Sequence, residues 1–503
     1  MSITGPGSIT GSNLIAQNNI FTQLDTLSTE LGTGEAAQTY SGLGSQAGLA
    51  LSLNAQLSAL EGYGNTTTDV GTTLTLAQSV LTQLGNVSSD VQSSVTDQAA
   101  FSLNSNGQTA TQVTAASYLD QIVSLLNTQV GSNYLFSGSA VNQPSVADTN
   151  EILDGNGTQA GLTQVIAERL QADQGANGLG RLVIPAASGS TVSVSEDVAG
   201  SPFGFKLASV NSSLTGATVT GPSGSPASIS VNLGSNPNAG DTIQFNLTLP
   251  DGSSQTITLQ ATTASPPGTD QFTIGANAAA TATNLQAALT TAVSNLAQTA
   301  LPAASAIAAA DNFFSSDPPQ RVNGPPFNTA TSLVNGTSAN TVFWYTGENG
   351  ATPALQTATA QIGPSMTIDY GMRANEQAIS SLMANVGVMA AATYSASDPN
   401  AQASYEALSR SVSANLAGQP GVQSIADIET DLANAQTAVK NATALNTQTQ
   451  NTLQNMVQGI TGINQNQIGE DILTLQNNLS ASLSVTARLA QMSLVNYLAP
   501  VTG

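Results

Sequence analysis

The sequence predicts an α+β protein in which long antiparallel, coiled-coil-like helices from both ends of the chain carry a β-rich domain between them. Two observations predict this fold. Near both ends, apolar residues recur in alternating steps of four and three, which is the spacing of a coiled-coil seam. In the middle, over about residues 181–352, apolar and polar residues alternate instead, as they do in half-buried strands.

The N-terminal part predicts four helices in succession. Residues 1–11 hold three glycines and a proline, so we expect them to be flexible. Glycines end the first helix and open the connection to the second, because glycine is the usual residue after a helix. The third helix carries the longest seam of this half: Val70, Leu74, Ala77, Leu81, Leu84, Val91 and Val95. The four helices are expected near residues 13–34, 50–60, 70–95 and 114–130.

The middle of the chain predicts strands and one helix. Over residues 242–261, two alternating runs are separated by Pro250, Asp251 and Gly252, which are turn residues, so this stretch predicts a β-hairpin. An amphipathic pattern predicts a helix over 279–300. The helical period then resumes at Ala374 and continues to Leu498.

The longest predicted helix lies in the C-terminal part. An apolar seam runs over residues 425–463, with an interruption between Ala442 and Leu453. As a single helix this stretch would extend roughly 58 Å at 1.5 Å per residue. A rod of this length is poorly suited to enclose an active site.

The composition limits the partners of this chain. Only 8% of its 503 residues are charged, and the formal net charge is −22. Nucleic acid and anionic lipid are recognised through clustered lysine and arginine, so we expect neither as a partner. No apolar run reaches the roughly 18 residues of a membrane span. The few basic residues are scattered: Arg169, Arg181, Lys206, Arg321, Arg373, Arg410, Lys440 and Arg488.

The residue inventory also argues against catalysis. The chain has no cysteine and no histidine, which removes thiolate metal sites and imidazole bases. A serine nucleophile would need Lys206 or Lys440 as its base, and neither stands in a Ser-x-x-Lys arrangement. The carboxylates within 427–431 fit a solvated helix face, and the glycines within 175–180 fit a plain loop. We therefore predict no enzyme and no catalytic, cofactor-binding or metal-binding residue.

The terminal seams predict contacts between subunits. A seam on a single helix is most often ordinary domain core, but here the seams continue to the ends of the chain, where no further residues follow to cover them. We therefore favour packing between copies of the chain. The predicted interface residues are Ile20, Leu24, Leu27, Leu31, Ile468, Ile472, Leu475, Leu479, Leu483, Leu494 and Leu498.

Four segments resemble the bacterial flagellin family, which includes the hook-associated protein 3 of the hook–filament junction. Residues 27–50 are similar to the family's "LSSG…AAGLAI" segment, and residues 134–139 to its "YLFSG" stretch. Residues 368–376 are similar to "YGVRANE", and residues 480–498 resemble the C-terminal helix. The four segments occur in the family's order.

The resemblance implies a secreted axial protein that leaves the cell unfolded through the flagellar type III apparatus. Residues 1–19 lack the basic and apolar regions of a cleaved signal peptide, which agrees with another export route. Implied partners are copies of the chain, hook-associated and cap proteins, and an export chaperone. The implied location of the assembled protein is the extracellular flagellum. The implied domains are a core helix at 1–41 (D0-like), a helical segment at 42–180 (D1-like), a β-rich outer domain at 181–352, a helical segment at 353–464 (D1-like) and a core helix at 465–503 (D0-like).

Three functions remain open at this stage. The stretches "YLFSGS" and "SLVNYL" favour the junction protein, whereas the length of the chain and its large β-rich middle favour the filament subunit, which we prefer. A surface adhesin or phage-tail-like fibre fits the acidic, Thr/Asn-rich middle but leaves the matched terminal seams unexplained.

Overall fold

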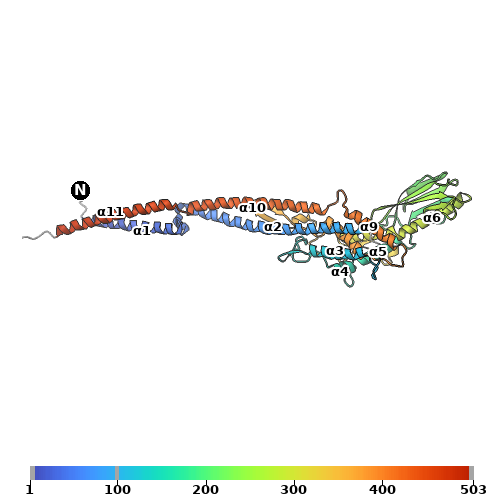
Figure 1. Cartoon of the computed structure of the whole chain (residues 1–503), viewed down its shortest axis with the longest axis horizontal. Helices are drawn as coiled ribbons and strands as arrows, with labels where there is room; N and C mark the ends of the chain where they lie inside the picture. Colours follow the sequence, from blue (N-terminus) through green and yellow to red (C-terminus); the bar gives the residue numbers. More distant parts are fainter. Residues whose placement is uncertain (1–5, 97–100, 498–503) are drawn as a thin grey trace, which may run out of the picture. The chain divides into compact units, whose positions relative to one another are not determined.

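The computed structural model describes residues 6–96 and 101–497, and these form an α+β fold with two compact units (Figure 1). The first unit comprises the described residues of Met1–Gly71, Ala360–Ile368 and Thr437–Gly503, and the second comprises those of Thr72–Thr359 and Asp369–Gln436. Helices α2 (Ala47–Thr96) and α10 (Ile425–Thr461) each contribute residues to both units.

The first unit contains an antiparallel pair of long helices, α1 (Pro6–Thr33) and α11 (Gln465–Tyr497), which run side by side in Figure 1. The segment after α1 meets the end of α10, where the amide of Ala36 donates to the carbonyl of Thr461 at 2.7 Å. The 3-10 helix η1 (Tyr40–Gln46) then leads into α2.

Apolar packing also joins the parts of α2 and α10 that belong to this unit. Leu53, Leu60 and Leu453 are buried together, with Tyr63 and other residues around them. A two-stranded hairpin, β13 (Thr359–Gly363) with β14 (Met366–Asp369), lies against α10, where the amide of Asn446 donates to the carbonyl of Ile362 at 2.9 Å.

The second unit has a helical core in which α3 packs on α8, and α7 packs on α5, α8 and α9. Helices α7 and α8 are almost completely buried because alanine and glycine let neighbouring helices approach closely. A Cβ at Gly387 of α8 would lie 3.1 Å from both Leu162 and Phe314. The helices of this core are α3 (Ala110–Leu126), α4 (Thr149–Asp154), α5 (Leu162–Gln174), α7 (Ala300–Phe314), α8 (Gln377–Ala391) and α9 (Ala401–Leu416).

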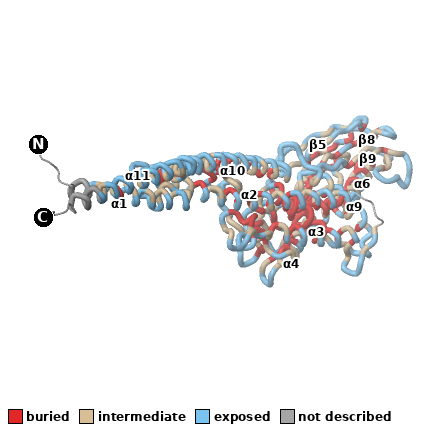
Figure 2. Tube along the Cα trace, turned by 60° about the vertical axis from the view of Figure 1, so that its left-hand side comes forward, coloured by how far each residue is buried: buried red, intermediate tan, exposed pale blue. Residues whose placement is uncertain are grey.

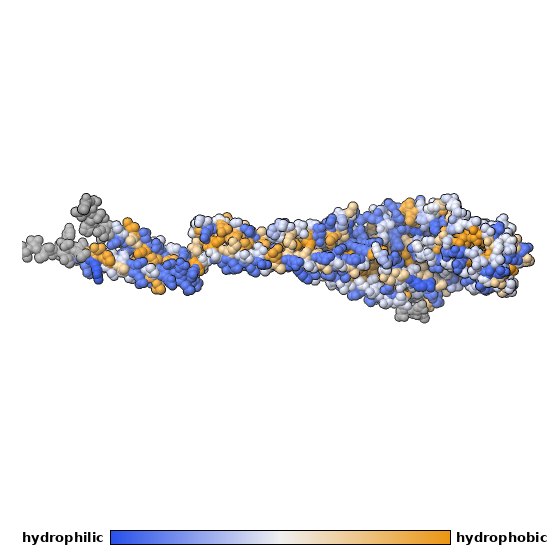
Figure 3. Space-filling model, turned by 90° about the horizontal axis from the view of Figure 1, so that it is seen from above, coloured by the Kyte–Doolittle hydropathy of each residue, from blue (hydrophilic) through white to orange (hydrophobic). Residues whose placement is uncertain are grey.

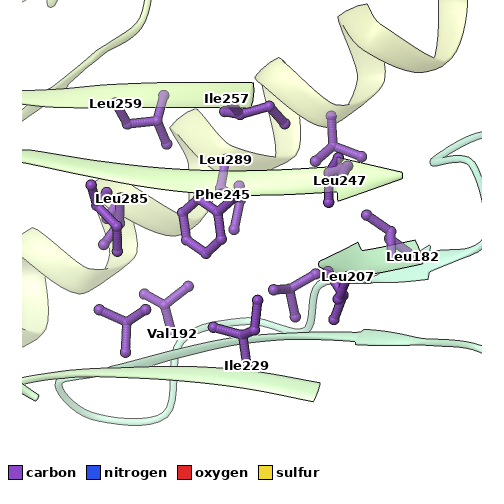
Figure 4. Packing of buried hydrophobic residues seen from close by; sticks show 14 of the residues in the cluster. Leu182, Val192, Leu207, Ile229, Phe245, Leu247, Ile257, Leu259, Leu285 and Leu289 are labelled. Carbon is purple, nitrogen blue, oxygen red and sulfur yellow. The ribbon is translucent and has the colours of Figure 1, made fainter. Parts of the chain in front are cut away.

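The β-rich part of this unit consists of two four-stranded sheets and helix α6, which share one apolar core (Figure 4). Figure 4 shows residues of β8 and β9 meeting residues of β4 and β7, together with Leu285 and Leu289 of α6. The edge strand β6 holds Pro222, where the missing amide interrupts no central ladder. The elements are β3 (Leu182–Val183), β4 (Thr191–Glu196), β5 (Lys206–Ser212), β6 (Ala217–Ser223), β7 (Ser228–Leu233), β8 (Thr242–Thr248), β9 (Ser254–Thr262), β10 (Gln271–Thr273) and α6 (Ala278–Gln298).

The strand orders are β3-β4-β7-β6 and β10-β9-β8-β5, with antiparallel neighbours except for the parallel pair β9 and β10. Two smaller hairpins complete the second unit. They are β1 (Gln129–Val130) with β2 (Asn133–Tyr134), and β11 (Gln320–Val322) with β12 (Leu333–Asn335); the 3-10 turns are η2 (Phe327–Thr329) and η3 (Ala354–Thr357).

Several predicted elements are confirmed and three are corrected. The hairpin over 242–261 is β8 with β9, the helix over 279–300 is α6, and the long C-terminal rod is α10. The flexibility expected for residues 1–11 is wrong from Pro6 onwards, since α1 begins there. The two helices predicted at 50–60 and 70–95 are one helix, α2, and the helix predicted over 114–130 ends at Leu126 because β1 and its turn follow.

The segment after α6 belongs to the helical core as well as to the β-rich part. Helix α7 contacts three core helices, and the indole of Trp344 donates to the carbonyl of Phe314 at 3.0 Å. The amide of Val342 donates to the carbonyl of Ala160 at 3.0 Å, and the amide of Ala160 donates to the carbonyl of Asn340 at 2.9 Å. Residues 300–352 therefore stabilise helices outside the predicted outer domain. Among the described residues no helix is long and apolar enough to cross a membrane.

Candidate assembly surface

The contact between α1 and α11 is the centre of the candidate surface. Each helix turns one half-buried stripe toward the other, because the stripe residues recur in steps of four and three. Figure 2 shows how burial differs between these helices and the second unit. The core of the second unit contains many buried positions, whereas the positions of α1 and α11 are mostly intermediate or exposed. The half-buried stripe positions are Ile20, Leu24 and Leu27 on α1, and Ile468, Ile472, Leu475 and Leu479 on α11.

Two of the predicted interface residues lie outside this stripe. Leu31 is 39% exposed and Leu483 is 47% exposed. At the C-terminal end of α11 the inward step passes through Ser482 instead of Leu483, which turns the leucine away from α1. The side chain of Leu494 and the whole of Leu498 lie outside the described residues.

One polar residue is buried in the stripe. Gln17 of α1 is only 7% exposed, and its amide donates to the hydroxyl of Thr486 at 2.9 Å and to that of Ser482 at 3.3 Å. Sequence analysis missed Gln17, although it stands three residues before Ile20 and so falls on the same helix face.

Large apolar side chains also remain exposed on the outer faces of these helices. Most of the exposed large apolar residues among the described part of the chain belong to the first unit, and in the space-filling view apolar residues reach the surface there (Figure 3). Leu14 and Phe21 lie two helical turns apart on one side of α1. Sequence analysis missed Leu14 and Phe21 because they stand outside the main seam. On α1 and α11 the exposed large apolar residues are Leu14, Ile15, Phe21, Leu31, Leu473, Leu483 and Val485.

Basic residues take little part in this surface. In the second unit Arg169 pairs with Asp173 at 2.8 Å and Arg181 pairs with Asp197 at 2.8 Å. The same unit holds ion pairs of Arg321 with Glu168, Lys206 with Glu196, and Arg373 with Glu348. These arginines hold loops and helices together inside their own unit.

The second unit also holds a cavity of about 980 Å³ between the β8–β9 turn, α7, α8 and α9. Asp251 of the turn and Asp311 of α7 both line it. Desolvation by the surrounding protein, together with the nearby negative charge of Asp251, raises the pKa of Asp311 to about 6. Within the described residues no group of three or more acidic side chains is placed to hold a metal ion.

The carboxylates within 427–431 have structural contacts. Asp427 accepts hydrogen bonds from the amide and hydroxyl of Ser424 at the start of α10, and these lower the pKa of Asp427. Glu429 accepts from the hydroxyl of Thr82 at 2.9 Å. These contacts cap the start of α10 and join α10 to α2 of the same chain. They agree with the expectation of a solvated helix face.

Two segments that resemble family motifs are hydrogen-bonded to each other in the second unit. The amide of Gly138 donates to the carbonyl of Met372 at 3.0 Å, and the amide of Ala374 donates to the carbonyl of Phe136 at 2.8 Å. Gly138 has a φ of +63°, which favours glycine. The stretches 134–139 and 368–376, far apart in sequence, thus form one local structure.

Comparison with known families finds a match in the N-terminal helices. Residues 9–141 match the family model of the bacterial flagellin N-terminal helical region. Helices α1, α2 and α3 thus form a region of the bacterial flagellin type. Flagellins are structural proteins of the flagellum that assemble into filaments. No curated protein matches the chain.

Proposed function

We propose that this chain is a flagellin, the subunit of the extracellular filament used for swimming, and that its copies assemble through α1 and α11. One observation carries the proposal: after α1 and α11 have packed together, their apolar side chains are still half-buried or exposed. Contiguous exposed apolar surface is costly in water and usually marks a contact with another protein. A second copy of the chain presents the same surface, which a helical assembly can cover.

The eleven residues predicted from the seams belong to this proposal as subunit contacts. The half-buried residues of the stripe, such as Leu24 and Leu475, hold the two helices of one copy together and leave their outer edges for a neighbour. Leu31 and Leu483 are the more direct candidates for contact with another copy, since each is largely uncovered by its own chain. Leu494 and Leu498 are proposed from the sequence pattern alone.

The same proposal includes the β-rich part and the further partners. We propose that the two sheets and α6 face solvent, because their apolar residues are covered by one another in a closed core. Hook-associated and cap proteins at the ends of the filament and an export chaperone before assembly are the partners that this role requires. Secretion through the flagellar export apparatus places the assembled protein outside the cell.

The hook–filament junction is the second candidate, favoured by the stretches "YLFSGS" and "SLVNYL". Labelling flagella with an antibody against the β-rich part separates the two roles. Labelling along the whole filament supports the filament subunit. A single spot where the hook ends supports the junction protein, and labelling of the cell body alone would contradict both and favour an adhesin.

A further inference from the structure

The stripe between α1 and α11 contains one buried amide among apolar residues. The amide nitrogen of Gln17 donates to both Ser482 and Thr486, which are one helical turn apart on α11. The hydroxyl of Thr486 in turn donates to the carbonyl of Ser482 at 2.8 Å. Because its proton is engaged there, the oxygen of Thr486 is oriented to accept from Gln17.

This arrangement exists in one register only. If α11 slipped by seven residues, the apolar stripe would still meet α1, because the seam repeats with that period. Gln17 would then face Leu475 and Leu479 instead of the two hydroxyls. The slipped register would therefore be destabilised, because a buried amide without a hydrogen-bond partner loses its hydration and gains nothing in exchange. The leucines of the stripe would contribute little to this difference, because each would meet another leucine.

We propose that Gln17 fixes the register of α1 against α11 and thereby fixes which outer apolar residues of the two helices lie level with one another. A polar residue at one seam position is known to select a register at some cost in stability. A slip of seven residues would move one helix along the other by about 10 Å, at 1.5 Å per residue.

The effect of this register on the assembly of copies rests on the proposed function. Phe21 on α1 and Leu473 on α11 are both more than half exposed and belong to the outer faces that a second copy would cover. A slip of about 10 Å would displace one of these faces relative to the other. A neighbour that fits both faces at once therefore requires the register that Gln17 selects.

The absence of cysteine from the chain allows a direct test by paired cysteines. Leu27 and Leu475 line the same groove between α1 and α11, so the double variant Leu27→Cys, Leu475→Cys reports the observed register. The double variant Leu27→Cys, Ile468→Cys reports a slip of seven residues. Each pair is oxidised in the full-length soluble chain, with Gln17 retained or replaced by Gln17→Leu, and disulfides within one copy are identified by their faster migration on a non-reducing gel.

With Gln17 retained, the pair at 27 and 475 should form its disulfide with a yield at least about tenfold above that of the slipped pair, since two net hydrogen bonds separate the registers. With Gln17→Leu the two yields should become comparable. The matched control is Gln476→Leu, the same chemical change at an exposed position of α11, which should preserve the preference. Equal yields with Gln17 retained, or an unchanged preference in Gln17→Leu, would overturn the proposal.

Stability and polymerisation provide a second readout. Thr486→Val removes the shorter hydrogen bond of Gln17 and should lower the thermal midpoint of the helix pair, whereas Gln17→Leu should not lower it. Gln17→Leu should nevertheless yield fewer and shorter polymers. If the unaltered chain itself forms no polymer, the proposed function fails, and the disulfide yields still decide the register.

Discussion

The carboxylate of Asp173 is completely buried, and its contacts join α5 to the loop before β5. One oxygen pairs with Arg169 at 2.8 Å, and the other accepts from the amide of Gly204 at 2.8 Å. Gly204 has a φ of +72°, and a Cβ there would lie 2.5 Å from Arg181, so only glycine allows this approach. The buried ion pair thus fixes the backbone at the entrance of the β-rich part.

Asp173→Asn should lower the free energy of unfolding of the second unit. The substitution leaves the charge of Arg169 buried without its counter-ion, which costs about 3–5 kcal/mol. Urea denaturation measures the change. Lys206→Gln is the control, because the pair of Lys206 with Glu196 is longer, at 3.6 Å, and partly exposed, and should contribute less than about 1 kcal/mol. Equal effects of the two variants would contradict this role of Asp173.

Asp311 should make the stability of the second unit depend on pH. Its folded-state pKa of about 6 lies above the ordinary value of 3.8, so the folded protein holds the proton more tightly than the unfolded chain. Unfolding then releases a proton between about pH 4 and 6, and the free energy of unfolding falls as the pH rises through that range. Above pH 6 this loss is complete.

Asp311→Asn removes this pH dependence. The variant should have a higher thermal midpoint than the unaltered chain at pH 7.5 and a similar one at pH 3.5. Asp120→Asn, at an exposed position of α3, serves as the control. A midpoint of Asp311→Asn that follows the unaltered chain at every pH would show that desolvation of the Asp311 carboxyl does not affect stability.

At the scale of elements, α1 and α11 each carry two sets of apolar residues. The inner stripe packs between the two helices, and the outer residues stay exposed when the helices are paired. Leu483 belongs to the outer group, because Ser482 takes the inward position beside Gln17. An exposed leucine contributes little to the stability of its own chain. Changes there therefore separate assembly from folding.

Leu483→Asp should block polymerisation and leave the soluble chain as stable as before. A neighbouring copy would bury the new carboxylate without a partner, whereas in the single chain it stays in water. Sedimentation measures the polymer, and circular dichroism measures the helices. Ser484→Asp places the same charge at the next exposed position and should be milder. Normal polymers of Leu483→Asp would place Leu483 outside the subunit contact.

The sequence predicts that these segments are helices better than it predicts which side of each helix packs against the other. The steps of four and three identify α1, α10 and α11, because burial of one side of a helix demands that period. The choice between Ser482 and Leu483 depends on the rotation of α11 against α1, which Gln17 influences from the other helix. No pattern within α11 alone contains that information.

Helix boundaries show the same limitation. Gly62 and Gly64 reduce helix propensity and suggest a break, yet α2 continues through them because Leu60, Thr67 and Val70 are buried on either side. The end of α3 at Leu126 is set by the hairpin β1–β2, whose strands are only two residues long and carry no alternating pattern. Tertiary contacts decide both cases.

At the scale of the whole molecule, the β-rich part is bounded more narrowly than the sequence pattern predicts. Arg181 donates to the carbonyls of Ala172 and Ala330 and is itself buried, and α7 forms part of the helical core. The shared apolar core of the two sheets and α6 therefore reaches Leu301 and Ala304 at the start of α7, and the rest of α7 packs in the helical core.

Deletion of residues 182–299 with a short glycine-serine linker should spare folding of the helical core and polymerisation. Deletion of residues 181–352 should abolish both, because it removes α7 and the buried arginine. Electron microscopy of the polymers and circular dichroism of the soluble chains distinguish the outcomes. Polymers from both deletions would show that α7 is dispensable, and polymers from neither would make the β-rich part a structural requirement.

The close approach of Gly180 to α7 has a practical consequence. A Cβ at Gly180 would lie 3.1 Å from the side chain of Leu301, so the chain leaves the helical core and returns to it at nearly the same place. A foreign domain whose own termini are adjacent could be grafted between these two points with little strain on the scaffold. If the filament forms as proposed, each copy would then display the grafted cargo.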